Sequence, residues 1–236
     1  MLENKFSKIS IIIPVFNEEK TLLQLLEKVI HAPVANLQKE IIIINDFSTD
    51  NTKNILDNIQ DKNIKILHHQ KNQGKGAALQ TGFKVVTGDI ILIQDADLEY
   101  NPNEYQNLIQ PILDGQADIV YGSRFIGAQP HRVLYFWHYL GNKFLTLLSN
   151  MFSNLNLTDM ETCYKVFKKE VIEKINIEEK HFGFEPEFTI KAARQKFRFY
   201  EIGIAYAGRT YEEGKKIKAK DGWRAIWCIV KYGVFN

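Results

Sequence analysis

One pattern recurs along the first half of the chain: a short run of Ile, Val and Leu is followed by a polar turn and then by apolar residues at helical spacing. The paired segments are 9–15 and 18–31, 40–45 and 52–58, 64–68 and 75–86, and 89–94 and 103–113, with one further apolar run at 118–122. Strands that are apolar throughout are buried on both faces, as in parallel sheets covered by helices. The pattern therefore predicts an α/β fold with a mainly parallel central sheet and a ligand crevice beyond the carboxyl ends of its strands.

The second half of the chain differs in character. Residues 133–152 form a long aromatic helix candidate, and 159–206 mix short strands with a helix near 186–195. No repeat or low-complexity linker separates the two halves, so we expect one domain over residues 1–220. The remaining residues 221–236 predict an amphipathic helix at a membrane interface, since basic residues precede an aromatic run there.

Composition limits the classes of function. Lys and Arg total 30 and Asp and Glu total 28, so the net charge provides no reason to expect nucleic-acid binding. Cys163 and Cys228 lie far apart without metal-ligand or redox spacing, so neither a disulfide framework nor a zinc site is indicated. Residues 1–10 lack a signal-peptide pattern, so we expect a cytoplasmic protein. Neither 133–152 nor 223–235 has the roughly 20 continuous apolar residues of a membrane-spanning helix, although either segment suits a membrane surface.

The strongest chemical signal is a group of carboxylates at the end of an apolar run. Asp95, Asp97 and Glu99 closely follow 90–93. Clustered carboxylates repel one another unless a cation neutralises them, and Mg²⁺ or Mn²⁺ prefers oxygen ligands and leaves positions open for phosphate oxygens. A second interpretation is a polar turn that caps the next helix, for which the Asn-Pro pair at 101–102 is suited. The motif alone does not choose between a metal bound to a diphosphate and a helix cap.

Three further polar segments follow predicted strands. At 16–19 an aromatic ring and the amides of a helix N-terminus suit a nucleotide, but Asn17 is also a good N-cap. Asp46 suits hydrogen bonds from a base or ribose, but its segment also suits an Asx or Ser turn. Gly74 and Lys75 suit a close approach to phosphate, but glycines also occur in ordinary turns. Each signal is weak alone, and all four polar segments are expected at the same edge of the sheet.

The order of these four segments resembles glycosyltransferase family 2, whose members have the GT-A nucleotide-sugar (Rossmann-like) fold. The matching segments are IIIPVFNEE (11–19), NDFSTD (45–50), NQGKG (72–76) and DAD (95–97). Three more segments look like the dolichyl-phosphate mannose and glucose synthases and their bacterial polyprenyl-phosphate relatives: GSR (122–124), DMETCYK (159–165) and RTYEEGKK (209–216). The likeness runs from about residue 10 to about residue 222.

The resemblance implies roles for individual residues. The implied donor-binding residues are Pro14, Phe16, Glu18, Ile44, Asp46, Lys75, Asp95 and Ala96. The implied ligands of a Mg²⁺ or Mn²⁺ ion are Asp95, Asp97 and Glu99, although relatives often have glutamine in place of Glu99. The implied catalytic residues are Asp97, Arg124, Arg209 and Lys215, the last two on a flexible loop that closes over charged groups. The implied acceptor-binding residues are Arg132, Asp159, Glu161 and Lys216.

The implied reaction is an inverting transfer from a nucleotide sugar to a polyprenyl phosphate. The metal and cationic side chains stabilise the departing diphosphate while the acceptor attacks the anomeric carbon from the opposite face. A phosphate monoester is already an anion near neutral pH, because its second pKa is about 6, so it requires no strong general base. A sugar hydroxyl would require one, and the candidate carboxylates are Asp159, Glu161, Glu185 and Glu187.

Several alternatives stay open at this point. We expect a UDP-sugar rather than a GDP-sugar as donor and undecaprenyl phosphate as acceptor, at the inner face of the cytoplasmic membrane. The aromatic segment 133–152, with Arg132 before it, either offers a groove to a prenyl chain or simply packs in the core. The alternative functions are transfer to a saccharide or protein acceptor and a non-catalytic nucleotide-sugar binding module. The first strand is followed by neither a Walker spacing nor a Gly-x-Gly-x-x-Gly turn, which disfavours P-loop and dinucleotide enzymes.

Overall fold

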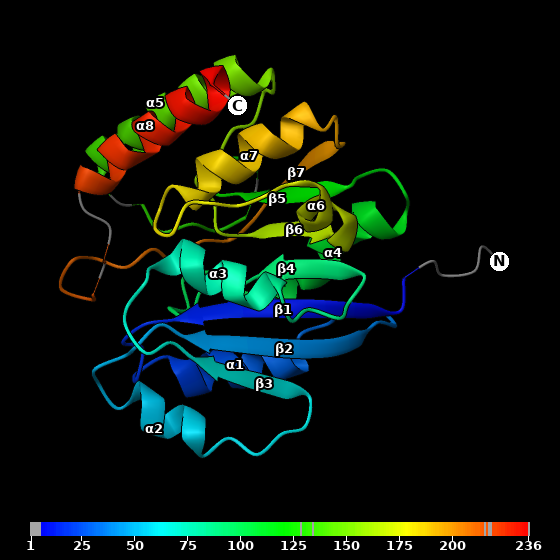
Figure 1. Cartoon of the computed structure of the whole chain (residues 1–236), viewed down its shortest axis with the longest axis vertical. Coiled ribbons are helices and arrows are strands. Elements are labelled where there is room, and N and C mark those ends of the chain that lie inside the picture. The colour runs from blue at the N-terminus through cyan, green and yellow to red at the C-terminus, as the bar shows by residue number, and fades with distance from the viewer. Residues whose placement is uncertain (1–5, 128, 134, 215, 217–218, 236) are drawn as a thin grey trace.

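The computed structural model describes residues 6–127, 129–133, 135–214, 216 and 219–235. Its centre is a seven-stranded sheet in the order β3-β2-β1-β4-β6-β5-β7 (Figure 1). The strands are β1 (Lys8–Val15), β2 (Gln38–Asn45), β3 (Ile64–His68), β4 (Ile90–Ile93), β5 (Ile119–Ser123), β6 (Lys165–Lys168) and β7 (Phe199–Gly203). Neighbouring strands are parallel except at β6, which runs antiparallel to both β4 and β5. The predicted α/β fold with a mainly parallel sheet is confirmed.

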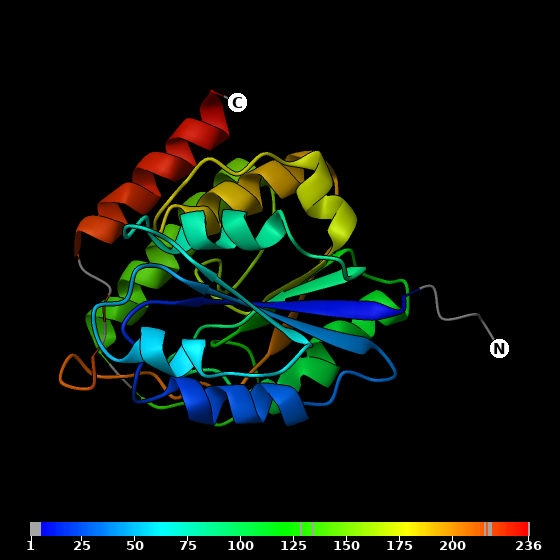
Figure 2. The ribbon, with the colours of Figure 1, turned by 60° about the horizontal axis from the view of Figure 1, so that its bottom comes forward.

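Helices cover both faces of the sheet, as Figure 2 shows. The helices are α1 (Leu22–His31), α2 (Thr52–Asp57), α3 (Lys75–Phe83), the short 3-10 helix η1 (Pro102–Glu104), α4 (Tyr105–Leu113), α5 (Phe136–Ser153), α6 (Lys169–Lys174), α7 (Phe184–Arg194) and α8 (Ala219–Val234). Helices α1 and α4 lie on one face, and α3, α6 and α7 lie on the other (Figure 2). Helices α5 and α8 pack side by side and against α7 at one end of the molecule (Figure 1).

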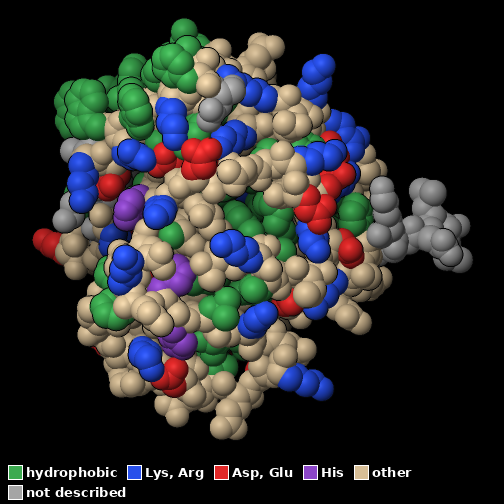
Figure 3. All heavy atoms as spheres, viewed as in Figure 1, with side chains coloured by type: hydrophobic (Ala, Val, Ile, Leu, Met, Phe, Trp, Pro, Cys, Tyr) green, Lys and Arg blue, Asp and Glu red, His purple; other side chains and the backbone are tan. Residues whose placement is uncertain are grey.

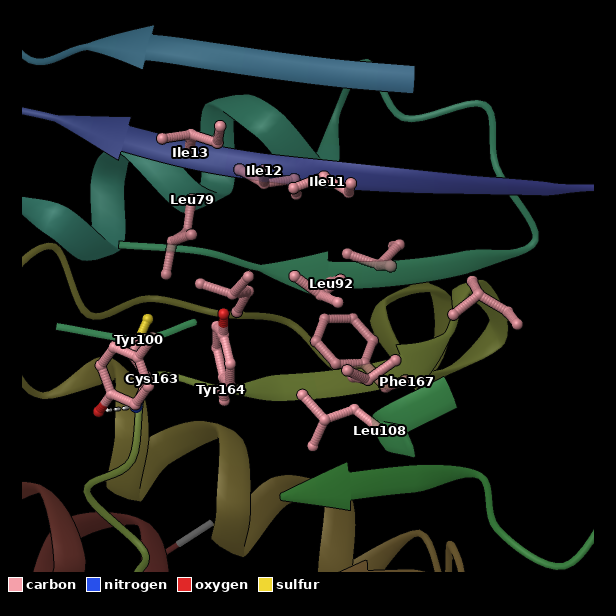
Figure 4. Packing of buried hydrophobic residues seen from close by; sticks show 14 of the residues in the cluster. Ile11, Ile12, Ile13, Leu79, Leu92, Tyr100, Leu108, Cys163, Tyr164 and Phe167 are labelled. Carbon is pink, nitrogen blue, oxygen red and sulfur yellow. Dashed lines mark hydrogen bonds between the residues drawn. The ribbon is translucent and has the colours of Figure 1, made fainter. Parts of the chain in front are cut away.

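The core explains why the strands are apolar at every position. Ile11, Ile12 and Ile13 of β1 are successive residues, so they point to alternating faces, and none has exposed surface. Figure 4 shows these three residues in one cluster with Leu92 of β4 and Phe167 of β6. Each fully buried side chain of this size contributes roughly 1.5–3 kcal/mol of transfer free energy, so the double-sided core is the main stabilising term.

A buried polar contact fixes the end of β4. Gln94 has no exposed surface, and its Oε1 accepts hydrogen bonds from the hydroxyls of Tyr105 and Tyr164, both at 2.7 Å. Its Nε2 donates to the backbone oxygen of Asp95 at 2.9 Å. The chain therefore leaves β4 in a defined direction, and the carboxylates that follow are held on rigid backbone.

Three boundaries differ from the sequence prediction. Helix α1 begins at Leu22 rather than at residue 18, because Asn17 has a positive φ of 51° and the chain turns before it becomes helical. Helix α5 begins at Phe136, three residues after the expected start. Helix α8 begins at Ala219, so the expected boundary between the domain (1–220) and the C-terminal helix (221–236) falls within the first turn of α8. That boundary stays a prediction. Among the described residues, none of the helices combines the length and the apolar character that a bilayer-spanning segment requires.

Candidate active site

A cavity of about 880 Å³ lies beyond the carboxyl ends of β1, β2 and β4 and reaches α5 and α8. Parallel strands carry the residues that follow them to one edge of the sheet, which explains how distant segments meet here. The cavity is lined by most of the predicted site residues: Pro14, Phe16, Glu18, Asp46, Lys75, Asp95, Ala96, Asp97, Glu99, Arg124, Glu161, Arg209 and Lys216.

Three predicted residues within the described part of the chain do not line the cavity, and a fourth lies outside that part. Ile44 has no exposed surface and belongs to the core. Asp159 is also fully buried. The side chain of Arg132 is 44% exposed and pairs with Glu213 at 2.6 Å. Lys215 lies outside the described residues.

Carboxylates from two strand ends surround one guanidinium. Nη2 of Arg209 lies 3.0 Å from Oε1 of Glu18 and 3.1 Å from Oδ2 of Asp97. Burial raises the pKa of Asp97, the negative charges of Asp95 and Glu99 raise it too, and Arg209 lowers it, which together place this pKa at about 7. Lys216 also pairs with Glu18 at 2.7 Å and Lys75 with Asp95 at 3.0 Å, so among the described residues three cations face these four carboxylates, and the remaining negative charge attracts another cation.

Two of these carboxylates are suited to bind a divalent metal ion. Among the described residues, no three His, Cys, Asp or Glu side chains stand ready as a complete ligand set. Both oxygens of Glu99 are already engaged, Oε2 by the hydroxyl of Tyr206 and Oε1 by the backbone N–H of Arg209, each at 2.7 Å. Asp95 and Asp97 are the suitable pair, since their side-chain partners are the cations Lys75 and Arg209, whose charge a metal ion can replace. Mg²⁺ is commonly bound through one or two carboxylates together with substrate phosphates and water, and this arrangement matches that mode.

Asp46 organises the loop between β3 and α3. Its Oδ1 accepts from the backbone N–H of Gln73 at 2.8 Å, and its Oδ2 accepts from that of Gly74 at 2.7 Å. Nδ1 of His69 also lies 2.7 Å from Oδ1, and Nε2 lies 2.9 Å from the hydroxyl of Thr81. A carboxylate has about four lone-pair sites, so one is left for a ligand. Sequence reasoning missed His69, because only folding brings the end of β3 beside the end of β2.

Lys75 joins two carboxylates across the cavity floor. Its Nζ lies 3.0 Å from Oδ1 of Asp95 and 3.1 Å from Oε1 of Glu185. Burial acts to lower the pKa of Lys75, but the charges of Asp95 and other neighbours outweigh it and hold the pKa well above its usual range. The next residue, Gly76, packs so tightly that a Cβ there would lie 2.2 Å from the carbonyl oxygen of Glu179. The glycine-rich segment therefore serves close packing that aims Lys75 into the site.

Arg124 is held by Asp159 in a two-point ion pair. Nε of Arg124 donates to Oδ2 at 2.6 Å, and Nη2 donates to Oδ1 at 2.7 Å. Burial acts to raise the pKa of Asp159, but Arg124 outweighs this and lowers it. The guanidinium also lies 5.2 Å from the ring centre of Tyr206. Asp159 therefore positions Arg124 and remains an anion that is fully engaged.

The four carboxylates that were candidates for a general base differ in their availability. Asp159 is engaged by Arg124. Glu187 is fully buried and accepts hydrogen bonds from the two backbone amides of 178–179, at 2.9 and 2.8 Å. In contrast, Oε1 of Glu161 and Oε2 of Glu185 have no hydrogen-bond partner among the described residues, and both side chains line the cavity. Glu161 and Glu185 are therefore the carboxylates left for a ligand.

A loop from the second half of the chain lies over the part of the cavity that Glu18 and Phe16 line. Lys216 lies 2.7 Å from Oε1 of Glu18 and donates to the backbone oxygen of Phe16. Its Nζ also lies 5.6 Å from the ring centre of Phe16. The loop thus supplies both Arg209 and Lys216 to Glu18, while the closing of these cations over the charged groups of a ligand stays a prediction.

Comparison with known proteins identifies the family. A sequence model of glycosyl transferase family 2 matches residues 10–176. The chain belongs to glycosyltransferase family 2. The match spans β1 to the end of α6 and includes Glu18, Asp46, Lys75, Asp95 and Asp97.

Relatives of this glycosyltransferase family 2 chain include two enzymes named for lipid-phosphate acceptors. It is 28% identical over 215 residues to the undecaprenyl-phosphate 4-deoxy-4-formamido-L-arabinose transferase of Proteus mirabilis, covering 89% of this chain and 63% of that protein. It is also 28% identical over 215 residues to the dolichol-phosphate mannosyltransferase of Pyrococcus furiosus, covering 89% of this chain and 60% of that protein. The chain therefore spans less than two thirds of the length of these relatives.

Solved structures confirm the fold of this family member. Glucosyl-3-phosphoglycerate synthase from Mycobacterium tuberculosis, solved with Mn²⁺, UDP and glucosyl-3-phosphoglycerate, matches with a TM-score of 0.73 and 17% identity, over 96% of this chain and 80% of that one. The same enzyme solved with Mn²⁺, UDP and phosphoglyceric acid matches with a TM-score of 0.75 and 16% identity, over 98% and 80% of the two chains. At this identity the likeness concerns the fold, and it confirms the predicted GT-A type of α/β architecture.

Proposed function

We propose that this chain transfers a sugar from a nucleotide-sugar donor to a polyprenyl phosphate, with inversion at the anomeric carbon and with Mg²⁺ or Mn²⁺. The observation that carries the proposal is the meeting of Asp95 and Asp97 with Arg124, Arg209 and Lys216 at one cavity. Two carboxylates for a metal beside three cations suit a diphosphate leaving group and a phosphate acceptor together. The names of the two lipid-phosphate relatives support the same acceptor class.

The donor is proposed to lie along the ends of β1, β2 and β4. Phe16 offers an aromatic surface for the base, and Asp46 offers one remaining acceptor site to a base N–H. A uridine diphosphate sugar is favoured over a guanosine one, in line with the UDP in the solved structures of the same fold. Ile44 supports this wall from the core and does not touch the donor itself.

Asp95 and Asp97 are proposed to hold the metal, which when bound supplies positive charge to the diphosphate oxygens. Arg209 and Lys216 neutralise Glu18 and Asp97 in the present arrangement. They are proposed to turn toward the diphosphate when the donor is bound and so stabilise the departing charge. Arg124, held rigid by Asp159, orients a phosphate at the entrance of the cavity. A phosphate acceptor is an anion near neutral pH, so the engaged state of Asp159 is no obstacle to the transfer.

The acceptor end is proposed to lie on a membrane surface. Helices α5 and α8 present exposed apolar side chains that we call the α5–α8 apolar surface: Phe136, Trp137, Leu140, Phe144, Leu147, Met151, Trp223 and Trp227. Figure 3 shows hydrophobic side chains gathered over this end of the molecule. Patches of this kind mark protein or membrane interaction sites, and the exposed Lys220 nearby suits anionic lipids. We propose peripheral attachment to the inner face of the cytoplasmic membrane.

The test is release of nucleoside diphosphate from a panel of UDP-sugars and GDP-sugars, with Mg²⁺ or Mn²⁺, with and without a short polyprenyl phosphate. The proposal expects metal-dependent release that the lipid stimulates and that Asp97→Ala abolishes, while Glu173→Ala on the exposed face of α6 behaves as wild type. Metal-dependent donor binding without stimulation by any polyprenyl phosphate would redirect the search to saccharide or protein acceptors. Donor binding without any release of nucleotide would indicate a binding module.

A further inference from the structure

We propose that Glu185 and Glu161, with Lys75, form a subsite that reads hydroxyl groups of the transferred sugar and selects neutral or amino sugars over uronic acids. This inference rests on the proposed function and adds the class of sugar, which neither the relatives nor the fold identifies.

Glu185 has the geometry of a ligand-binding carboxylate. Its side chain is only 4% exposed, and its Oε1 is held by Lys75 at 3.1 Å. Its Oε2 has no partner among the described residues, and the residue lines the cavity. A buried carboxylate oxygen without a partner is costly, and native structures keep such groups mainly where a ligand or ordered water completes them. The free Oε2 therefore indicates a place for a hydrogen-bond donor from the substrate.

Glu161 provides a second carboxyl on the same wall. Its Oε1 is also buried without a partner. Burial raises the pKa of Glu161 to about 8, and the charge of Glu185 is the largest like charge that adds to this effect. A protonated Glu161 offers one O–H donor, and the unpartnered Oε2 of Glu185 offers an acceptor. Vicinal hydroxyls of a pyranose, each both donor and acceptor, match this combination.

The position of Lys75 links the subsite to the reacting end of the donor. One ammonium contacts Glu185 and also Asp95, at 3.1 and 3.0 Å. If Asp95 holds the metal at the diphosphate, Glu185 lies one side chain further, where the sugar attached to that diphosphate must extend. The sequence resemblance assigned Glu161 to the acceptor; we place it at the donor sugar, because its unpartnered Oε1 and the unpartnered Oε2 of Glu185 belong to side chains that line the same cavity.

The charges of the subsite determine which sugars fit. The cation of Lys75 is matched by Asp95 and Glu185, and the fully buried Lys165 donates to the backbone oxygens of Met160 and Thr162, so neither cation is open to a sugar carboxylate. A uronic acid would bring a further anion next to Glu185 and meet repulsion. Neutral hexoses avoid this repulsion, and an amino sugar gains an ion pair. A site built to hydrogen-bond a hydroxyl also rejects analogues that lack it.

The experiment measures binding of the nucleoside diphosphate and of its sugar conjugate separately, by calorimetry with Mn²⁺. The ligands are UDP, UDP-glucose and UDP-glucuronic acid, or the corresponding guanosine forms if wild type prefers GDP. The affinity of each ligand is measured for wild type, for Glu185→Gln, for Glu161→Gln and for the control Glu173→Gln. We expect UDP affinity within about twofold of wild type in every variant. We expect UDP-glucose to bind about tenfold more weakly to Glu185→Gln, and the preference for glucose over glucuronic acid to shrink by a similar factor.

Each other outcome has a definite meaning. Unchanged affinity for UDP-glucose in both variants overturns the proposed subsite. An equal loss of affinity for UDP and UDP-glucose also overturns it. Unchanged donor affinity with abolished turnover in Glu185→Gln also overturns it and makes Glu185 a general base for a hydroxyl acceptor. Because Glu185→Gln removes one partner of Lys75, Glu161→Gln serves as the variant that leaves this ion pair intact. If neither UDP nor GDP binds with metal, the proposed function itself fails, which is a different result.

Discussion

The guanidinium of Arg124 is fixed by two hydrogen bonds of 2.6 and 2.7 Å to Asp159, a residue with no exposed surface. This pair joins a cation that lines the cavity to an anion that is sealed in the protein. It identifies Asp159 as a positioning residue.

Replacing Asp159 with Asn tests this role. The substitution leaves Arg124 without its buried counter-charge, and we expect a loss of about 3 kcal/mol in the free energy of unfolding. A misdirected Arg124 is expected to reduce turnover about 100-fold. Denaturant unfolding and steady-state kinetics measure both effects, with the exposed Asp114→Asn as control. A shifted pH profile with normal stability would contradict the positioning role and favour a base.

Replacing Asp97 with Asn is expected to make the protein more stable and less active. Its carboxylate lies near Asp95 and Glu99 with insufficient positive charge, so Asp97→Asn relieves repulsion in the absence of metal. We expect the variant to be more stable than wild type by about 1 kcal/mol in EDTA at neutral pH. Its turnover is expected to fall 100-fold or more, because stabilisation of the leaving group depends on the bound charge.

Thermal melts with and without Mn²⁺ check whether Asp97 binds the metal. Mn²⁺ with UDP is expected to raise the melting temperature of wild type and to leave that of Asp97→Asn nearly unchanged. An equal rise in both proteins would mean that the metal binds elsewhere.

Asp118 makes a contribution to stability that depends on pH. It accepts hydrogen bonds from Arg198 and from Lys168, which lies 2.6 Å away, and these contacts lower its pKa. A carboxylate with a lowered pKa in the folded state stabilises the protein above its unfolded pKa of about 3.9 and loses this effect as the pH falls further. The site is partly solvated, so we expect Asp118→Asn to cost only about 1 kcal/mol at pH 7. In denaturant curves the difference between Asp118→Asn and wild type is expected to be full at pH 7, smaller at pH 3, and absent only below the lowered pKa of the folded protein.

We predict that the α5–α8 apolar surface binds membranes through Trp223 and Trp227. Trp223 and Trp227 are 74% and 54% exposed, and neither lines the cavity. Replacing both with Ser is expected to weaken sedimentation with anionic vesicles at least tenfold, since two large apolar side chains lose their contact with lipid. Turnover with a water-soluble short-chain acceptor is expected to be unchanged. The control is Tyr200→Ser on β7, and equal binding by all three proteins would exclude this surface as the membrane contact.

Local sequence patterns predict most of the fold for a physical reason. Strands such as β1 and β2 are buried on both faces, so every position is apolar and the run is visible in the sequence. Strand β6 was harder to predict, because it spans four residues with Lys at each end, and Lys165 is fully buried. Its antiparallel direction depends on its partners β4 and β5 rather than on its own residues.

The site was predictable where its residues follow strands directly, as Asp46 and Asp95 do. The partners of these residues were not, since His69 reaches Asp46 through the pairing of β2 with β3, and Glu185 is linked to Asp95 only through Lys75. The sequence likewise suggested Asp159 as a ligand contact, whereas its complete burial against Arg124 is a property of the packed structure.

Glu179 has a consequence for where this protein can be shortened. Its carbonyl oxygen accepts from Gln80 of α3, and its carboxylate, at 3% exposure, is held by Arg224 of α8 at 2.7 Å. Truncation before α8 would remove Arg224 and Tyr232, which hold that carboxylate, and would loosen the turn against which Gly76 packs. The last helix is thus a structural closure of the nucleotide pocket, and a catalytic fragment that ends at residue 218 is expected to fold poorly.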